Sequence, residues 1–212
     1  MKKLIPIFLS VIFFASCTNS KFYTARTCMV CLNPTDGILV LPLIWEPTFR
    51  VLSVAEKNQI ERQIISLLNK EGFQKVEILD NLDYKLLREG IKDLNDPVQR
   101  EKLSSKLGYS YLLGLTLGPT RVGETWGYQT AQEVYDMAPV PDMEVSSILR
   151  MALISTETGQ IDSDFTITST NSGFSTSDKD DGLDYQNYTK LAGVIRHGIT
   201  KGTKNLVKSC SC

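Results

Sequence analysis

The sequence has little of what most enzyme motifs require. Its 212 residues include a single histidine, His197, and two tryptophans, so any serine or cysteine triad must use that one imidazole as its base. No GxGxxG, Walker A or HExxH pattern occurs, although these patterns mark dinucleotide, phosphate and zinc-protease sites. We therefore expect a protein that is not an enzyme.

A surplus of charge of one sign is also missing. The chain has 23 Lys and Arg residues against 24 Asp and Glu residues, a formal net charge of −1. Binding to nucleic-acid phosphates depends on clustered basic side chains, so no nucleic-acid partner is expected. Apolar residues make up 42% of the chain, which together with its length is typical of one globular domain.

The sequence has no apolar run long enough to span a membrane. Its most apolar stretch, residues 4–15, follows Lys2 and Lys3. Twelve helical residues span about 18 Å, which is short of the hydrocarbon core of roughly 30 Å. A basic start followed by a short apolar segment indicates a cleaved signal peptide, here residues 1–16.

The residues at the end of this stretch resemble a bacterial lipobox. Phe14-Ala15-Ser16-Cys17 places two small residues before a cysteine, with Phe14 where the motif usually has Leu, Val or Ile. The resemblance implies a diacylglycerol on the Cys17 thiol and an acyl group on its new amino group, with no other cofactor. Because Thr18 is not the aspartate of inner-membrane retention, it also implies the outer membrane, facing the periplasm.

Removal of the signal peptide changes the charge balance. Two lysines are lost, which leaves 21 basic residues against 24 acidic ones, a net charge of −3. The mature chain is predicted to consist of a lipidated tether (17–36), a single domain (37–208) and a cysteine-containing tail (209–212). A domain of this size buries about 70% of its unfolded surface, which is enough for one hydrophobic core.

Strand and helix patterns alternate along this domain. Residues 38–44 form an apolar run that predicts a strand, which should end or bulge at Pro42. Ser53 and Glu56 form a capping box that opens a helix. We predict the other strands at 76–79, 109–117, 145–155 and 160–169, and the other helices at 83–89, 97–107 and from about 184 onward. The order β-α-β-α-α-β-β-β-α predicts an α/β sandwich of two or three layers, with helices on a mixed sheet of about five strands.

Three of these segments together resemble a known lipoprotein domain. They are residues 38–43 (ILVLPL), 108–114 (GYSYLLG) and 151–161 (MALISTETGQI). Their sequence and order are similar to those of the domain shared by the curli-secretion lipoproteins, the lipoprotein activators of penicillin-binding proteins and the amino-terminal domain of TolB. The resemblance spans residues 37–207 and implies a binding or assembly module of the cell envelope.

Four cysteines remain besides Cys17, namely Cys28, Cys31, Cys210 and Cys212. The periplasm is oxidising, which favours disulfides. A bridge inside residues 210–212 would be strained, so cross-links between the amino-terminal tether and the carboxyl terminus are expected. Two alternatives stay open: a four-cysteine zinc site, and a redox pair in the CxxC of residues 28–31, which lacks the preceding strand of such motifs.

The longest connection in the predicted domain is residues 118–143, which is long for a compact fold. It carries residue types that are enriched at protein interfaces, and we take these as partner-binding candidates: Arg121, Trp126, Tyr128 and Tyr135. The alternative is that the aromatic side chains fold back over an edge of the sheet. The acidic segment 178–184 lacks the carboxylate spacing of a calcium loop and predicts a solvated turn.

These observations favour a lipid-anchored periplasmic adaptor that binds another envelope protein in assembly or secretion. One alternative is a small-ligand or metal-handling enzyme that uses the four cysteines or His197. Another is a subunit of a homo-oligomeric envelope ring.

Overall fold

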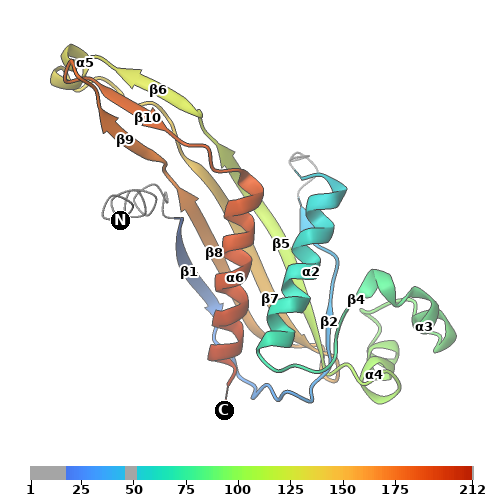
Figure 1. Cartoon of the computed structure of the whole chain (residues 1–212). Helices are drawn as coiled ribbons and strands as arrows, with labels where there is room; N and C mark the ends of the chain where they lie inside the picture. Colours follow the sequence, from blue (N-terminus) through green and yellow to red (C-terminus); the bar gives the residue numbers. More distant parts are fainter. Residues whose placement is uncertain (1–17, 46–51, 212) are drawn as a thin grey trace, which may run out of the picture.

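The computed structural model describes residues 18–45 and 52–211 (Figure 1). It confirms the mixed α/β fold. A seven-stranded sheet has the order β1-β8-β7-β5-β2-β4, with β3 also paired to β5, and a separate three-stranded sheet has the order β6-β10-β9. The expected number of about five strands was therefore too low. The main-sheet strands are β1 (Asn19–Arg26), β2 (Ile38–Val40), β3 (Ile44–Trp45), β4 (Val76–Ile78), β5 (Tyr111–Val122), β7 (Val145–Ser155) and β8 (Ile161–Asn171).

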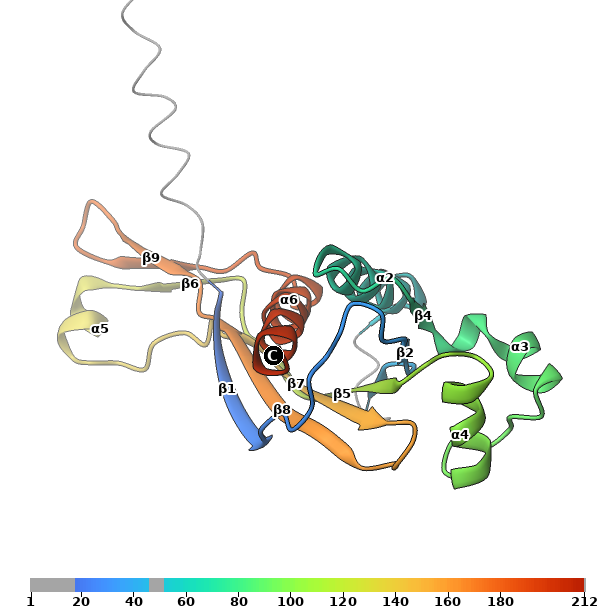
Figure 2. The same ribbon diagram turned by 90° about the horizontal axis from the view of Figure 1, so that it is seen from below.

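Helices cover the main sheet from both sides. On one face, α2 (Val54–Lys70) and α6 (Leu191–Ser209) lie side by side (Figures 1 and 2). On the other face, α3 (Asp83–Arg88) and α4 (Pro97–Ser105), with a short 3₁₀ turn at Leu79–Asn81, cover β2 and the start of β5. Strand β2 is therefore buried on both faces, which explains its uninterrupted apolar sequence.

The predicted helix signals are confirmed at the atomic level. The Ser53 hydroxyl accepts a hydrogen bond from the Glu56 amide, while the Glu56 carboxylate accepts one from the Ser53 amide, and α2 starts at the next residue. Ile60, Ile64 and Leu68 of α2 face the core. Asp96 caps α4 by accepting a hydrogen bond from the Val98 amide at 2.9 Å. Local sequence therefore sets where these helices begin.

Two glycines of α6 face the sheet. A Cβ atom at Gly198 would lie 2.8 Å from the Ser169 hydroxyl, and one at Gly202 would lie 2.5 Å from the Met151 sulfur and 2.6 Å from Ile167 Cδ1. Glycine weakens a helix interior by about 1 kcal/mol relative to alanine. Here it allows the helix to approach β7 and β8 closely.

The prediction of a tether at residues 17–36 is wrong, because residues 19–26 form strand β1 of the main sheet. Asn19–Arg26 pairs antiparallel with β8, with Asn19 opposite Thr170 and Phe22 opposite Ile167. Phe22 also packs against Phe165, with 6.3 Å between ring centroids. An edge strand has one neighbour and exposes most of its side chains, so its sequence needs little of the apolar alternation that reveals inner strands.

Candidate functional site

A long extension of the sheet projects away from the body of the protein. We call it the arm and define it as residues 123–143 and 172–187. It contains β6 (Trp126–Gln129), α5 (Ala131–Tyr135), β9 (Phe174–Ser177) and β10 (Leu183–Gln186). Figures 1 and 2 show that it continues the direction of β5, β7 and β8 beyond the start of α6. Its side chains are therefore displayed outside the main core.

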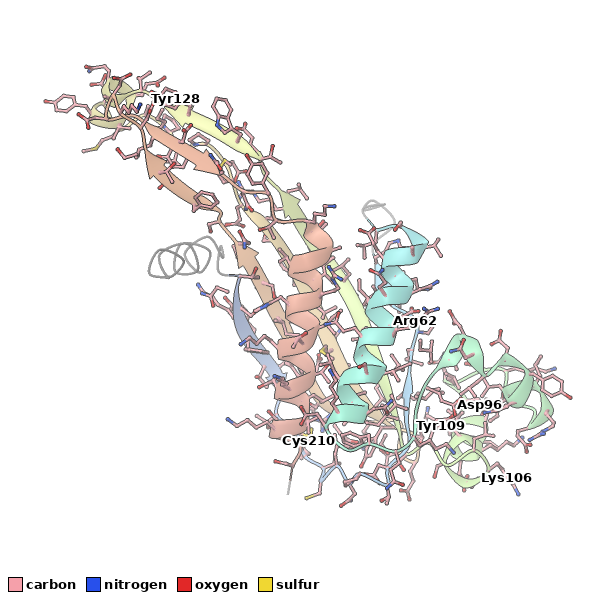
Figure 3. The ribbon with its side chains drawn as sticks, viewed as in Figure 1. Arg62, Asp96, Lys106, Tyr109, Tyr128 and Cys210 are labelled. Carbon is pink, nitrogen blue, oxygen red and sulfur yellow. A yellow bond between two sulfur atoms is a disulfide. The ribbon has the colours of Figure 1, made fainter. Side chains whose placement is uncertain are left out.

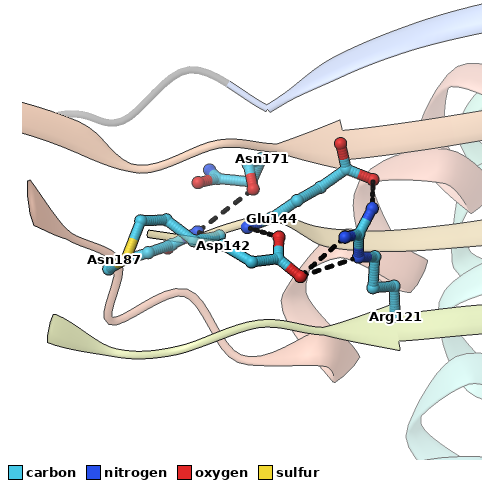
Figure 4. A network of polar contacts seen from close by, with 6 residues as sticks. Arg121, Asp142, Glu144, Asn171 and Asn187 are labelled. Carbon is cyan, nitrogen blue, oxygen red and sulfur yellow. Dashed lines mark hydrogen bonds and ion pairs between the residues drawn. The ribbon is translucent and has the colours of Figure 1, made fainter. Parts of the chain in front are cut away.

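Asparagine side chains hold the base of the arm (Figure 4). Asn187, which is 2% exposed, donates hydrogen bonds to the carbonyl oxygens of Met143 at 2.6 Å and Asn171 at 3.1 Å. Asn171 in turn accepts a hydrogen bond from the Gly173 amide and donates one to the Thr18 hydroxyl. One buried side chain thus joins the two chain segments from which the arm is built.

An exposed ion pair supports the same base. The guanidinium of Arg121 donates two hydrogen bonds to one carboxylate oxygen of Asp142, at 2.7 and 3.0 Å, and lies 4.0 Å from the Glu144 carboxylate (Figure 4). The sequence placed Arg121 among the partner-binding candidates. In the structure its guanidinium is instead paired with Asp142 and Glu144 of the same chain. These contacts join β5 to the residues just before β7.

One face of the arm sheet is covered by the chain between α5 and β7. The side-chain amide of Gln129 donates hydrogen bonds to the carbonyl oxygens of Ala138 and Pro139. The oxygen of the same side chain accepts a hydrogen bond from the Tyr185 hydroxyl at 2.7 Å. Gly127 lies directly beneath Pro141, where a Cβ atom would approach the proline ring to 2.6 Å. The covering chain thereby fixes the arm as a small two-layer structure.

The opposite face of the arm sheet is open. Side chains alternate along a strand, so Trp126 and Tyr128 lie opposite to Gly127 and Gln129. Trp126 is 57% exposed and Tyr128 is 37% exposed, and Figure 3 shows Tyr128 near the far end of the arm. The register pairs Tyr128 with Asp184, and Trp126 with Gln186. This open face combines two aromatic rings with a carboxylate.

More apolar side chains are exposed at the tip, around α5. Tyr135 is 82% exposed, Met137 is 90% exposed and Val140 is 61% exposed. Monomeric proteins seldom leave such side chains together on a projecting element unless they bind something. The three aromatic candidates from the sequence, Trp126, Tyr128 and Tyr135, are therefore brought together on the arm.

The arm is strongly acidic. It contains one lysine, Lys179, and eight carboxylates: Glu124, Glu133, Asp136, Asp142, Asp178, Asp180, Asp181 and Asp184. Partial burial raises the pKa of the Tyr128 hydroxyl, and the negative charges of Asp178, Asp180 and Asp184 raise it further. The open face therefore lies in a negative electrostatic field.

The sequence did not predict the second half of the arm. The last helix was expected from about residue 184, whereas Leu183–Gln186 is strand β10 and α6 begins at Leu191. Residues 118–122, expected in a loop, are the end of β5. The alternation of Leu183, Asp184, Tyr185 and Gln186 is the signal that identifies this strand.

The cysteines cross-link the two ends of the chain. Cys28 and Cys210 form a disulfide with 5.3 Å between their Cα atoms, which confirms the expected link from the amino-terminal segment to the carboxyl terminus. Cys31 is also disulfide-bonded, and Cys212 lies outside the described residues, as does Cys17. Next to the bridge, the Leu32 amide donates a hydrogen bond to the Cys210 carbonyl at 2.8 Å.

The structure also describes the residues of the alternative sites, apart from Cys212. Within residues 18–45 and 52–211, no group of three His, Cys, Asp or Glu side chains is placed to hold a metal ion. His197 lies on α6, and its buried Nε2 atom has no hydrogen-bond partner there. Burial lowers the pKa of this imidazole, and the neighbouring Lys201 charge lowers it further. Across the same residues, no helix is both long and apolar enough to cross a membrane.

Comparisons with known proteins find similar architectures at low sequence identity. No family model matches the chain, and no curated protein matches its sequence. Similar solved structures include the PelC dodecamer from Paraburkholderia phytofirmans, at 13% identity and a TM-score of 0.48 over 91% of this chain and 98% of that chain. Lipoprotein GNA1162 from Neisseria meningitidis is 14% identical, with a TM-score of 0.40 over 80% of this chain and 99% of that chain. The LpoB C-terminal domain from Salmonella enterica is 14% identical, with a TM-score of 0.38 over 63% of this chain and 82% of that chain. At this distance the similarities assign neither a family nor a function.

Proposed function

We propose that this protein is a lipid-anchored binding module of the bacterial outer membrane that faces the periplasm and works through protein-protein interaction. The arm carries this proposal, because it exposes Trp126, Tyr128, Tyr135 and Met137 outside the core of the protein. Aromatic and methionine side chains are enriched at protein interfaces. In this role the protein is not an enzyme, and it takes no cofactor besides the acyl chains on Cys17.

The location in the envelope rests on the amino terminus and on the disulfide. A basic, apolar start followed by Ala15-Ser16-Cys17 supports export and lipidation. The bridge between Cys28 and Cys210 is compatible with an oxidising compartment. The arm therefore binds another protein of the cell envelope, during envelope assembly or secretion.

The proposal is tested by photocross-linking in cells. A photoreactive amino acid replaces Tyr135, which is 82% exposed at the tip of the arm, and in a matched control it replaces Tyr84, which is 79% exposed on α3. We expect one dominant protein adduct from the Tyr135 position and none of the same mass from the Tyr84 position. Both variants should fractionate with the outer membrane.

Two results would contradict the proposed function. One is a folded, membrane-bound Tyr135 variant that gives no protein adduct. The other is the same set of adducts from both positions, since these would then reflect proximity in the envelope rather than binding by the arm.

A further inference from the structure

Opposite charges are separated along this chain. The arm has eight carboxylates and one lysine. Outside the arm, the mature chain retains 20 of its 21 basic residues and 16 of its 24 acidic residues, which gives a net charge of +4. A nearly neutral sequence therefore folds into a negative arm on a positive body.

The positive charge is most concentrated on α6. This helix carries Arg196, Lys201, Lys204 and Lys208 and no acidic residue, and these four side chains are exposed. Residues three, four and seven apart lie on one side of a helix, so Lys201, Lys204 and Lys208 form one stripe opposite the buried face. On the adjacent helix α2, Arg62 and Lys70 are also exposed.

The arm does not cover this helix in its own chain. It begins beyond the amino-terminal end of α6 and extends away from it (Figure 1). The α6 lysines have no salt bridge among the described residues. The acidic arm and the basic face of α6 therefore do not contact each other within one chain. Their opposite charges make them suited to contact each other between two chains.

We infer that the arm of one copy binds the exposed face of α6 on a second copy. This inference rests on the proposed role of the arm as a protein-binding surface and names a second copy as its partner. Carboxylates such as Asp180 and Asp184 pair with the α6 lysines and Arg196. Trp126 and Tyr128 supply aromatic faces that also attract cations.

This contact is head-to-tail, because it joins two different surfaces. Each copy keeps a free arm or a free α6 after the first contact forms, so association continues beyond a dimer as concentration rises. Because the attraction is between exposed charges, it weakens as salt screens them. An anionic lipid or nucleic acid is a poor occupant of the arm, since its eight carboxylates carry like charge.

The test measures mass by light scattering on the mature chain with Cys17→Ser, at low and at high salt. The wild-type form should grow beyond a dimer at low salt and return to a monomer at high salt. An arm variant, Asp180→Asn with Asp184→Asn, and a helix variant, Lys204→Glu with Lys208→Glu, should each weaken self-association by at least about tenfold. A matched control, Lys92→Glu with Lys106→Glu on the α3 and α4 side, should not.

Mixing the two variants gives the decisive result. The helix variant keeps a wild-type arm and the arm variant keeps a wild-type α6, so one productive contact between them remains. We expect the mixture to form a 1:1 heterodimer and nothing larger.

Three outcomes overturn the inference: a wild-type chain that stays monomeric at low salt, a mixture without heterodimer, or a control that weakens association as much as the helix variant. If the Tyr135 cross-link traps a different protein while the purified chain stays monomeric, the proposed function stands and this inference fails. If the chain associates as expected but Tyr135 traps nothing in cells, the proposed function is the part that fails.

Discussion

The sulfur of Cys28 is bonded to that of Cys210, across a sequence separation of 182 residues. The bond fixes the end of α6 to the segment that follows β1, at the end of the body opposite to the arm (Figure 1). Almost the whole mature chain is therefore enclosed between one pair of cysteines.

Removing the disulfide cross-links of the chain should lower stability strongly. In the chain-entropy model, closing a loop of this length stabilises the folded state by about 4 to 5 kcal/mol. Because Cys31 is also disulfide-bonded, the variant replaces Cys28, Cys31, Cys210 and Cys212 by serine together. We expect it to unfold at a clearly lower denaturant concentration than the oxidised wild type, as measured by circular dichroism in urea. An unchanged midpoint would show that the bridge does not constrain the unfolded chain as expected.

The glycines of α6 should respond to alanine in opposite directions. Gly202→Ala places a methyl group against Met151 and Ile167, and overpacking of this kind costs about 1 to 3 kcal/mol. Gly193 has no atom within 4 Å of the added Cβ, so Gly193→Ala should stabilise the protein by up to about 1 kcal/mol through helix propensity. Thermal unfolding of the two variants checks the sign of each effect, and two shifts in the same direction would contradict the close approach of α6.

Loss of the Asn187 side chain should loosen the arm. Asn187→Ala removes the donors to Met143 and Asn171 and leaves buried carbonyl groups without partners, which costs about 1 to 3 kcal/mol. Hydrogen exchange followed by mass spectrometry should become faster in residues 123–143 than in α2. Asn58→Ala, on the exposed face of α2, serves as the control, and equal exchange in both variants would count against the role of Asn187.

His197 should make stability depend on pH. Burial lowers the pKa of the folded imidazole below its unfolded value of about 6.5. The unfolded chain then binds more protons, so stability falls as pH decreases through the unfolded pKa and toward the lower, folded one. His197→Gln should remove this part of the loss between pH 7 and pH 5 in urea titrations. A wild type and a variant with the same pH dependence would be inconsistent with a buried imidazole.

Cys17→Ser should release the protein from the membrane. Without the thiol no diacylglycerol is added, and the remaining chain has no described helix that crosses a bilayer. Fractionation of cells should move the protein from the membrane to the soluble periplasmic fraction. Retention of the serine variant in the membrane would refute the lipid anchor.

The sequence predicted well those elements whose signals are local. The capping residues Ser53, Glu56 and Asp96 satisfy backbone groups within one helical turn, so they mark helix starts regardless of the rest of the fold. The hairpin of β7 and β8 was likewise visible from its alternation and from Gly159 in its turn. The disulfide link between the chain ends followed from compartment chemistry and strain.

Only the first segment of the arm, residues 123–143, could be recognised from the sequence, and the reason is physical. Its strands have four residues each and bury little surface, so no long periodic pattern marks them. Their pairing joins β6 to β10 across more than 50 residues, and no local signal encodes such a contact. Edge strand β1 escaped prediction for a related reason, because one-sided pairing permits a polar sequence.

Because residues 19–26 form strand β1, no long flexible segment separates Cys17 from the folded domain. With an acyl group on Cys17, the lipid is attached two residues before the sheet, and the Thr18 hydroxyl is already hydrogen-bonded to Asn171 at 3.1 Å. Strand β1 then extends for about 26 Å, and its first residue lies at the end of the sheet where the arm starts, because Asn19 is paired with Thr170. Copies held in this way diffuse in two dimensions with restricted rotation, which raises the frequency at which an arm meets a neighbouring α6.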